Sequence, residues 1–318
     1  MSYIVSNIVI LFWPDFWGFA VCSFFIALYK VLISGADETY LYLALENKED
    51  YTKVSGSLDS INFVLTGIAS IGVGYIYSIN KSYPFIISMI TCGVALVMAL
   101  RLKNLKEAES NTENIKTLFV EFKTNIKKGF VTVINARKLR WFMLFSAIMS
   151  FSLAAVLETY QLFFITKQIP VEYFGWIYFL LYIVSSVSSR FSYCFKKFNV
   201  YKIFMLLLGM LILTPLMMSL PYKHLFMVII IPRIVIGIYP AMIREYINKE
   251  LIEDRATIFS IRSLMSKMMQ VVLLPFVGLI IDEKGLNFSL FSIALIMSAL
   301  YIILLISLYK FKLVKKVS

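Results

Sequence analysis

Histidine, cysteine and acidic side chains are scarce in this sequence of 318 residues. It has one histidine, three cysteines and 19 acidic residues, against 31 lysines and arginines. The cysteines Cys22, Cys92 and Cys194 lie at unrelated spacings in or beside apolar runs, so neither a metal knuckle nor a disulfide framework is predicted. The lone His224 stands beside an expected loop, and the sequence contains no Walker, Rossmann or zinc-hydrolase motif. We therefore expect no metal and no cofactor.

Long apolar runs dominate what is present. Apolar residues make up 60% of the chain and charged residues 16%, which is more apolar surface than one soluble core can bury. A helix crosses about 30 Å of hydrocarbon in roughly twenty residues. Ten stretches of suitable length predict an all-α integral membrane protein: residues 1–13, 17–45, 56–78, 84–101, 139–166, 173–195, 201–220, 225–249, 257–281 and 288–309.

The basic residues fall mainly on one side of the predicted spans. If residues 46–55 lie inside, the cytoplasmic segments hold 21 lysines and arginines and the opposite loops hold four. Positively charged loops stay cytoplasmic, so the carboxyl terminus is predicted to be cytoplasmic. This topology accounts for the net charge of +12 without a nucleic-acid partner. The lipid bilayer is the expected partner, and a plasma membrane of bacterial type is the expected location.

Residues 102–138 are the one long polar stretch, with four spans before it and six after it. The division predicts an incomplete helical bundle at 1–101, a basic linker at 102–138 and a six-helix bundle at 139–318. Within the linker, apolar residues recur at helical spacing among lysines. This pattern favours a helix on the cytoplasmic membrane surface, with a solvated linker as the alternative. The residues are Ile115, Leu118, Phe119, Phe122, Ile126 and Phe130.

Two parts of the chain resemble each other at an offset of 204 residues. Internal repeats of this kind are typical of transporters. Extending the offset to the remaining spans predicts a layout of six plus six helices, of which the first two are missing. The offset aligns Tyr42 with Tyr246, Glu46 with Glu250, Glu49 with Glu253, Asp50 with Asp254, Val73 with Val277, Gly74 with Gly278 and Ile76 with Ile280.

Several segments resemble a bacterial branch of the major facilitator superfamily. Residues 34–38 (Ser-Gly-Ala-Asp-Glu) with Tyr42 and Tyr51 are similar to its fourth helix and the loop that follows, and residues 158–161, 174–176 and 255–260 to its seventh helix and the starts of its eighth and eleventh. On this resemblance the ten spans are helices three to twelve. The chain departs from the family in lacking the charged loop after helix two and the antiporter glycine-proline motif.

The resemblance implies that helices four, seven and ten help to line a central cavity. Charges inside a membrane are costly and are normally turned inward, paired or hydrated. Lys30 lies about 13 residues into the span at 17–45 and forms a polar stripe with Ser34 and Asp37 at i+4 and i+7. The alternative is that Asp37 and Glu38 merely lie near the cytoplasmic end of the span while Lys30 snorkels. The candidate cavity residues are Lys30, Ser34, Asp37, Glu158, Arg233, Lys267 and Gln270.

Glu158 and Arg233 share one membrane depth, each about 13 Å from the outer surface at about 1.5 Å per residue. We therefore expect an ion pair between them, either a permanent tie or a pair that substrate or a proton breaks. Pro232, Gly237 and Pro240 are candidate bending points, with a static kink as the alternative. The small residues of the span at 56–78, such as Ser70 and Gly74, are expected to permit close helix packing.

The expected function is transport of a small-molecule solute by alternating access, driven by a solute or ion gradient. A proton is a candidate coupling ion, and export is a candidate direction. The alternatives are a non-transporting, truncated remnant of such a transporter and a membrane sensor or enzyme. We do not expect an enzyme, because the predicted spans contain no set of His, Ser and acidic residues that resembles a catalytic constellation.

Overall fold

The computed structural model describes residues 2–33, 36–45, 47–101, 128–220, 227–251 and 255–310, and these residues form helices and short connections without any strand. Short 3₁₀ turns occupy Lys48–Asp50 (η1), Val171–Tyr173 (η2) and Ser192–Lys197 (η3). The α-helices are α1 (Ser2–Phe12), α2 (Phe16–Ile33), α3 (Ala36–Ala44), α4 (Tyr51–Ile79), α5 (Tyr83–Ala99), α7 (Arg137–Glu158), α8 (Tyr160–Thr166), α9 (Phe174–Arg190), α10 (Val200–Met218), α11 (Ile230–Lys249), α12 (Arg255–Lys284) and α13 (Leu286–Lys310).

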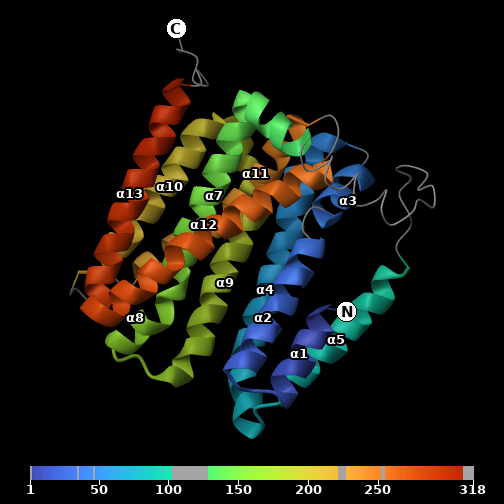
Figure 1. Ribbon diagram of the computed structural model, residues 1–318, viewed down its shortest axis with the longest axis vertical. Helices are drawn as coiled ribbons and strands as arrows, with labels where there is room; N and C mark the ends of the chain where they lie inside the picture. The colour runs from blue at the N-terminus through green and yellow to red at the C-terminus, as the bar shows by residue number, and fades with distance from the viewer. Residues whose placement is uncertain are drawn as a thin grey trace.

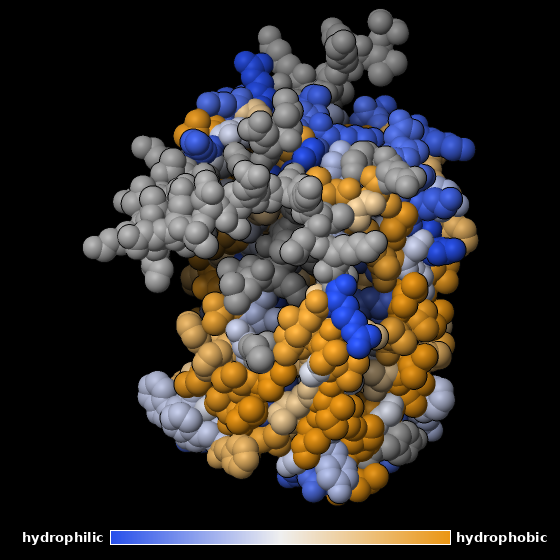
Figure 2. All heavy atoms as spheres, turned by 90° about the vertical axis from the view of Figure 1, so that its right-hand side faces the viewer, coloured by the Kyte–Doolittle hydropathy of each residue, from blue (hydrophilic) through white to orange (hydrophobic). Residues whose placement is uncertain are grey.

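Six helical segments within the described residues are long and apolar enough to cross a membrane. Figure 2 shows hydrophobic residues over much of the lower and right-hand part of this face, with hydrophilic residues concentrated at the top and a smaller number at the bottom. These features agree with the predicted all-α membrane protein, while the count of ten spans stays a prediction. The six segments are Tyr51–Val73, Arg137–Thr166, Val200–Met218, Met227–Lys249, Arg255–Lys284 and Leu286–Lys310.

The structure differs from the predicted spans at several helix ends. The single span expected at 17–45 contains two helices, α2 and α3, with Gly35, a poor helix former, between them in the sequence. The span expected at 173–195 becomes α9 followed by η3. Most of the predicted surface helix in the linker lies outside the described residues, although residues 128–135 are helical.

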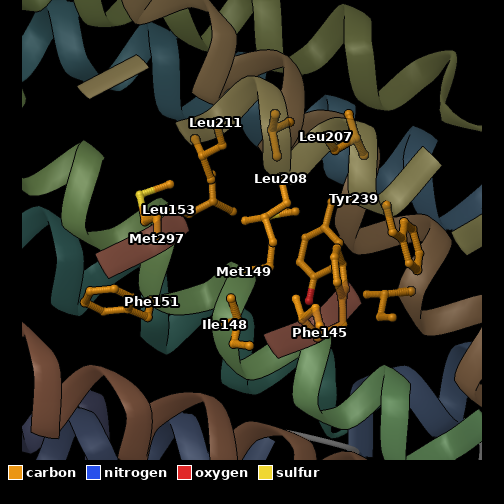
Figure 3. Packing of buried hydrophobic residues seen from close by; sticks show 14 of the residues in the cluster. Phe145, Ile148, Met149, Phe151, Leu153, Leu207, Leu208, Leu211, Tyr239 and Met297 are labelled. Carbon is orange, nitrogen blue, oxygen red and sulfur yellow. The ribbon is translucent and has the colours of Figure 1, made fainter. Parts of the chain in front are cut away.

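The largest cluster of buried apolar residues lies in the second half of the chain, around α7. Phe145 of α7 stacks on Phe204 of α10 with ring centroids 4.8 Å apart and meets Tyr239 of α11 edge-on at 5.8 Å. Figure 3 shows Met149 and Leu208 meeting in the same layer. These contacts make α7 the centre of a bundle with α10, α11 and α13, and α12 crosses α7 obliquely (Figure 1).

The first part of the chain joins this bundle mainly through α4. Helices α1, α2 and α5 pack together, whereas α4 runs antiparallel along α9 and also contacts α11 (Figure 1). Glycines let the α4 and α9 backbones meet. A Cβ on Gly56 would lie 2.4 Å from the carbonyl oxygen of Ser189, and one on Gly175 would lie 2.9 Å from that of Ser70. We call this contact the α4–α9 seam.

Close packing was predicted for Ser70 from the sequence, and the structure confirms it. The Ser70 hydroxyl donates to the carbonyl oxygens of Gly67, at 2.6 Å, and of Gly175 across the seam, at 3.1 Å. Small residues and interhelical hydrogen bonds of this kind replace the hydrophobic effect as the source of helix association in lipid. The seam therefore depends on the absence of side-chain bulk at a few positions.

Replacing Gly56 with Ala tests this dependence. The added methyl group has a backbone carbonyl 2.4 Å away, so α4 and α9 must separate, and we expect a loss of about 1–3 kcal/mol in stability. Gly93→Ala in α5 is the matched control, because a Cβ there meets nothing within 4 Å. Thermal unfolding of the purified variants in detergent measures both. Equal stability of the two variants would contradict the role assigned to the seam.

Candidate functional site

Serine hydroxyl groups connect α4 and α9 in the part of the seam that contains Gly56 and Ser60. The hydroxyl groups of Ser60 and Ser186 are hydrogen-bonded at 2.8 Å, and Ser189 donates to the Gly56 carbonyl oxygen at 2.9 Å. Nearer the middle, Phe63 of α4 stacks on Tyr182 of α9 with ring centroids 6.3 Å apart. The two helices thus meet through small polar groups and one aromatic pair, a contact with few interlocking side chains.

Charged groups cluster where residues 47–55 and η3 lie, and we call this region the basic end. Arg244 of α11 forms an ion pair with Asp59 of α4, and it also donates to the Ser55 hydroxyl at 2.7 Å. Arg190, at the last residue of α9, donates to Ser57 of α4 at 2.8 Å. These contacts tie α4 to α9 and α11, so the two parts of the chain are closed against each other here.

A second set of contacts at the basic end surrounds Glu245. Its side chain is 1% exposed and lies between two lysines, Lys196 at 2.9 Å and Lys249 at 2.7 Å. Lys196 also donates to the Glu49 carbonyl oxygen at 2.6 Å, which connects η3 to η1. Glu245 is thus a buried carboxylate whose charge is neutralised by the same lysine that reaches the first part of the chain.

The coupling energy between Asp59 and Arg244 measures how strongly α4 is attached to α11 at the basic end. Their side chains are 26% and 16% exposed, so we expect a coupling energy of about 1–3 kcal/mol from a double-mutant cycle of Asp59→Asn and Arg244→Gln. The exposed pair of Lys138 and Glu250, at 2.9 Å, is the control and should give less than about 1 kcal/mol. Chemical unfolding measures both cycles. A stronger coupling for the exposed pair would count against a closed basic end.

Lys267 and Gln270, both predicted cavity residues, are brought together on α12. Lys267 Nζ donates to Gln270 Oε1 at 2.9 Å, and Gln270 Nε2 donates to Ser150 Oγ on α7 at 2.8 Å. Lys30 of α2 is close enough to Lys267 for their positive charges to repel. Sequence reasoning missed Ser150, whose hydroxyl group fixes the amide of Gln270 and thereby leaves the amide oxygen for Lys267.

The polar stripe predicted on one helix does not exist in that form. Lys30 lies at the end of α2 with an exposed side chain, and Asp37 belongs to α3, so the i to i+7 relation does not apply to them. Ser34 lies outside the described residues, and the Asp37 side chain is also not among the described groups. Of the three, only the side chain of Lys30 is described.

Arg233 lies in the second turn of α11 and is almost fully buried, at 5% exposure. Three tyrosine rings surround its guanidinium carbon, those of Tyr182 at 4.6 Å, Tyr178 at 5.7 Å and Tyr160 at 5.8 Å. We call these four residues the arginine cage. The sequence carried one signal for it, since Tyr178 and Tyr182 are four residues apart and share a face of α9.

The predicted ion pair between Glu158 and Arg233 is not formed. Glu158 is exposed at the last residue of α7 and takes part in none of the four ion pairs of the described residues. Tyr160 lies beside α11 instead, where its hydroxyl donates to the Ile229 carbonyl oxygen at 2.7 Å. The prediction of a direct ion pair was therefore wrong, because equal depth along two helices does not bring two side chains into contact, whereas a contact bridged by water stays a prediction.

The candidate bending residues lie in one continuous helix. Pro240 is inside α11, and Pro232 lies in its first turn. Gly237 has a packing role, since a Cβ there would lie 2.6 Å from the Ser185 carbonyl oxygen of α9. The Ser185 hydroxyl in turn donates to the Arg233 carbonyl oxygen at 3.0 Å. Bending of α11 stays a prediction, while Gly237 explains how α9 and α11 approach each other.

Lys30, Arg233 and Lys267 are basic residues of apolar helices that take part in none of the four ion pairs of the described residues. Comparison of the sequence with models of known protein families and with curated proteins found no match. The role of these charges therefore has to follow from their positions. A charge at membrane depth costs several kcal/mol unless it is paired or hydrated, so these positions are the candidates for a functional role.

Proposed function

We propose that the protein is a secondary transporter that moves a small solute across the membrane by alternating access. The observation that carries this proposal is that Lys30, Arg233 and Lys267, contributed by α2, α11 and α12, have no acidic partner in the part of the chain that the structure describes. Charges of this kind in apolar helices mark solute and ion pathways far more often than structural positions. A solute site formed between two helix groups is the usual arrangement in secondary transporters.

The seam supports the motion that alternating access needs. Small residues and serine hydroxyl groups, such as Ser60 with Ser186, form much of this contact and would let α4 and α9 shift against each other, while Phe63 and Tyr182 form a stacked pair within it. At the basic end, the ion pair of Arg244 with Asp59 holds one side closed. Breaking this pair and hydrating its partners would let α4 move away from α11 at that end.

The resemblance to the major facilitator superfamily supports the same proposal. It supplies a layout of two similar halves and a basic end in the cytoplasm of a bacterial cell. The driving force we propose is an ion or solute gradient, since the sequence carries no nucleotide-binding motif. A proton is our candidate for the coupling ion, and export of the solute is our candidate for the direction.

Distances between spin labels test alternating access before any solute is known. One labelled pair, at Lys53 and Lys197, spans the basic end, and a second, at Asn80 and Glu172, spans the opposite end of the seam. In a background with the three cysteines replaced by serine, we expect two populations for each pair in nanodiscs. Asp59→Asn should raise the long-distance population at the basic end and the short-distance population at the opposite end.

A pair within one bundle is the control for this measurement. Arg137 and Lys202 begin α7 and α10, and both are exposed, so labels there should report one distance in every variant. Opposite changes at the two ends of the seam identify rocking, because simple loosening would lengthen both distances. A single distance at both ends that Asp59→Asn leaves unchanged would overturn the proposed function.

A further inference from the structure

The charge of Arg233 is surrounded by aromatic rings that do not neutralise it. Tyr160, Tyr178 and Tyr182 all lie within 5.8 Å of the guanidinium carbon. Stacking on aromatic faces is favourable for a guanidinium group, and it leaves the edge that carries the N–H groups available. The cage therefore holds the plane of Arg233 in place without using its hydrogen-bond donors.

Those donors have no acceptor among the described residues. Nε of Arg233 is fully enclosed and lacks a partner. Nη1 and Nη2 make no hydrogen bond to the described protein atoms either, but they are not fully enclosed, so they reach accessible space. A side chain that is 95% buried, since its exposure is 5%, thus presents an unused pair of donors at one edge.

Leaving a buried guanidinium unpaired is costly, and a group with two oxygens would remove that cost. Carboxylate and phosphate oxygens bind the fork of an arginine through two parallel hydrogen bonds, which a neutral amide cannot match in strength. The nearest expected carboxylate within the chain, that of Glu158, is exposed and forms no ion pair with Arg233. A bound anion would supply the oxygens that the described side chains do not supply.

The position of the cage connects it to the moving parts of the molecule. Tyr182 stacks on Phe63 of α4, and a Cβ on Gly67 of α4 would lie 3.1 Å from Cβ of Tyr182. A displacement of α4 along the seam would therefore change how far the cage is covered. Aromatic rings from two helices also provide an apolar surface for the body of a ligand beside its charged group.

We propose that the arginine cage is the recognition site for a small organic anion, a carboxylate or phosphate with an apolar or aromatic body. Arg233 binds the anionic oxygens through Nη1 and Nη2, and Tyr178 and Tyr182 contact the body. This assignment rests on the proposed function only in identifying the anion as the transported solute. Binding of an anion to Arg233 is a property of the cage itself.

Thermal unfolding of the purified protein in lipid-free detergent tests the site with defined probes. Benzoate and phenyl phosphate carry the anionic group, and benzamide is a neutral molecule of nearly the same shape as benzoate. We expect both anions to raise the unfolding temperature in a concentration-dependent way up to about 10 mM, a range that detects affinities near 1 mM. Benzamide should leave the unfolding temperature unchanged.

Substitutions in the arginine cage test whether benzoate binds there. Arg233→Gln should abolish the effect of benzoate, and Arg233→Lys, which keeps the charge but loses the fork, should weaken binding about tenfold. Arg137→Gln is the control, because it removes the same charge from an exposed position at the start of α7. If Arg233→Gln fails to fold, Arg233→Lys and Tyr182→Phe still report on the site, with Tyr182→Phe expected to retain anion binding.

Three results would overturn the proposal. The first is an equal effect of benzoate and benzamide, and the second is unchanged benzoate binding in Arg233→Lys and Arg233→Gln. The third is stabilisation by phosphatidylglycerol but by neither soluble anion, which would assign the cage to a lipid headgroup.

The test of anion binding and the test of alternating access can fail independently of each other. If the spin labels show rocking but no anion binds, the cage does not recognise the solute and the proposed function stands. If benzoate binds through Arg233 but the labels show one rigid state, the protein has an anion site without alternating access. Both positive results together would identify an organic anion as the solute class.

Discussion

The close approach of α4 to α9 is the constraint on which the arrangement of this molecule depends. It brings the first part of the chain against the second, and it exists because Gly56, Gly67 and Gly175 carry no side chain where backbone or ring atoms of the other helix lie. In lipid, where helices gain little from hiding apolar surface, such contacts and their hydrogen bonds provide the association energy. The placement of Tyr182, and with it the arginine cage, follows from this contact.

The charged side chains of the molecule are of two kinds, those in ion pairs and those without an acidic partner among the described residues. At the basic end the charges are paired, as in the contact of Arg244 with Asp59 and of Glu245 with two lysines. Deeper in the helices, Arg233 and Lys267 are held by aromatic rings or by an amide instead of a carboxylate. Paired charges stabilise one closed arrangement, whereas unpaired positive charges lower the cost of bringing in an anion. This division fits a molecule that is closed at one end and binds within.

The candidate site was only partly accessible from the sequence. Arg233, Lys267 and Gln270 were found because charged and polar side chains stand out in apolar runs. Their partners were not, since Ser150, Tyr160 and Tyr178 are ordinary residues of membrane helices and gain importance only through proximity. The expected ion pair of Glu158 with Arg233 is absent for the same reason, because counting residues along the chain gives depth in the membrane and does not give which side chains of different helices meet.

The sequence by itself determined that the chain is helical, that its helices are apolar enough for a membrane and that basic residues concentrate at one end. These properties are local: they follow from the length, composition and spacing of each segment. Only the tertiary structure decided that α4 lies on α9, that Lys267 is joined through Gln270 to α7, and that tyrosines surround Arg233. Such pairings join residues far apart in the chain, and they are set by which surfaces of different helices fit together.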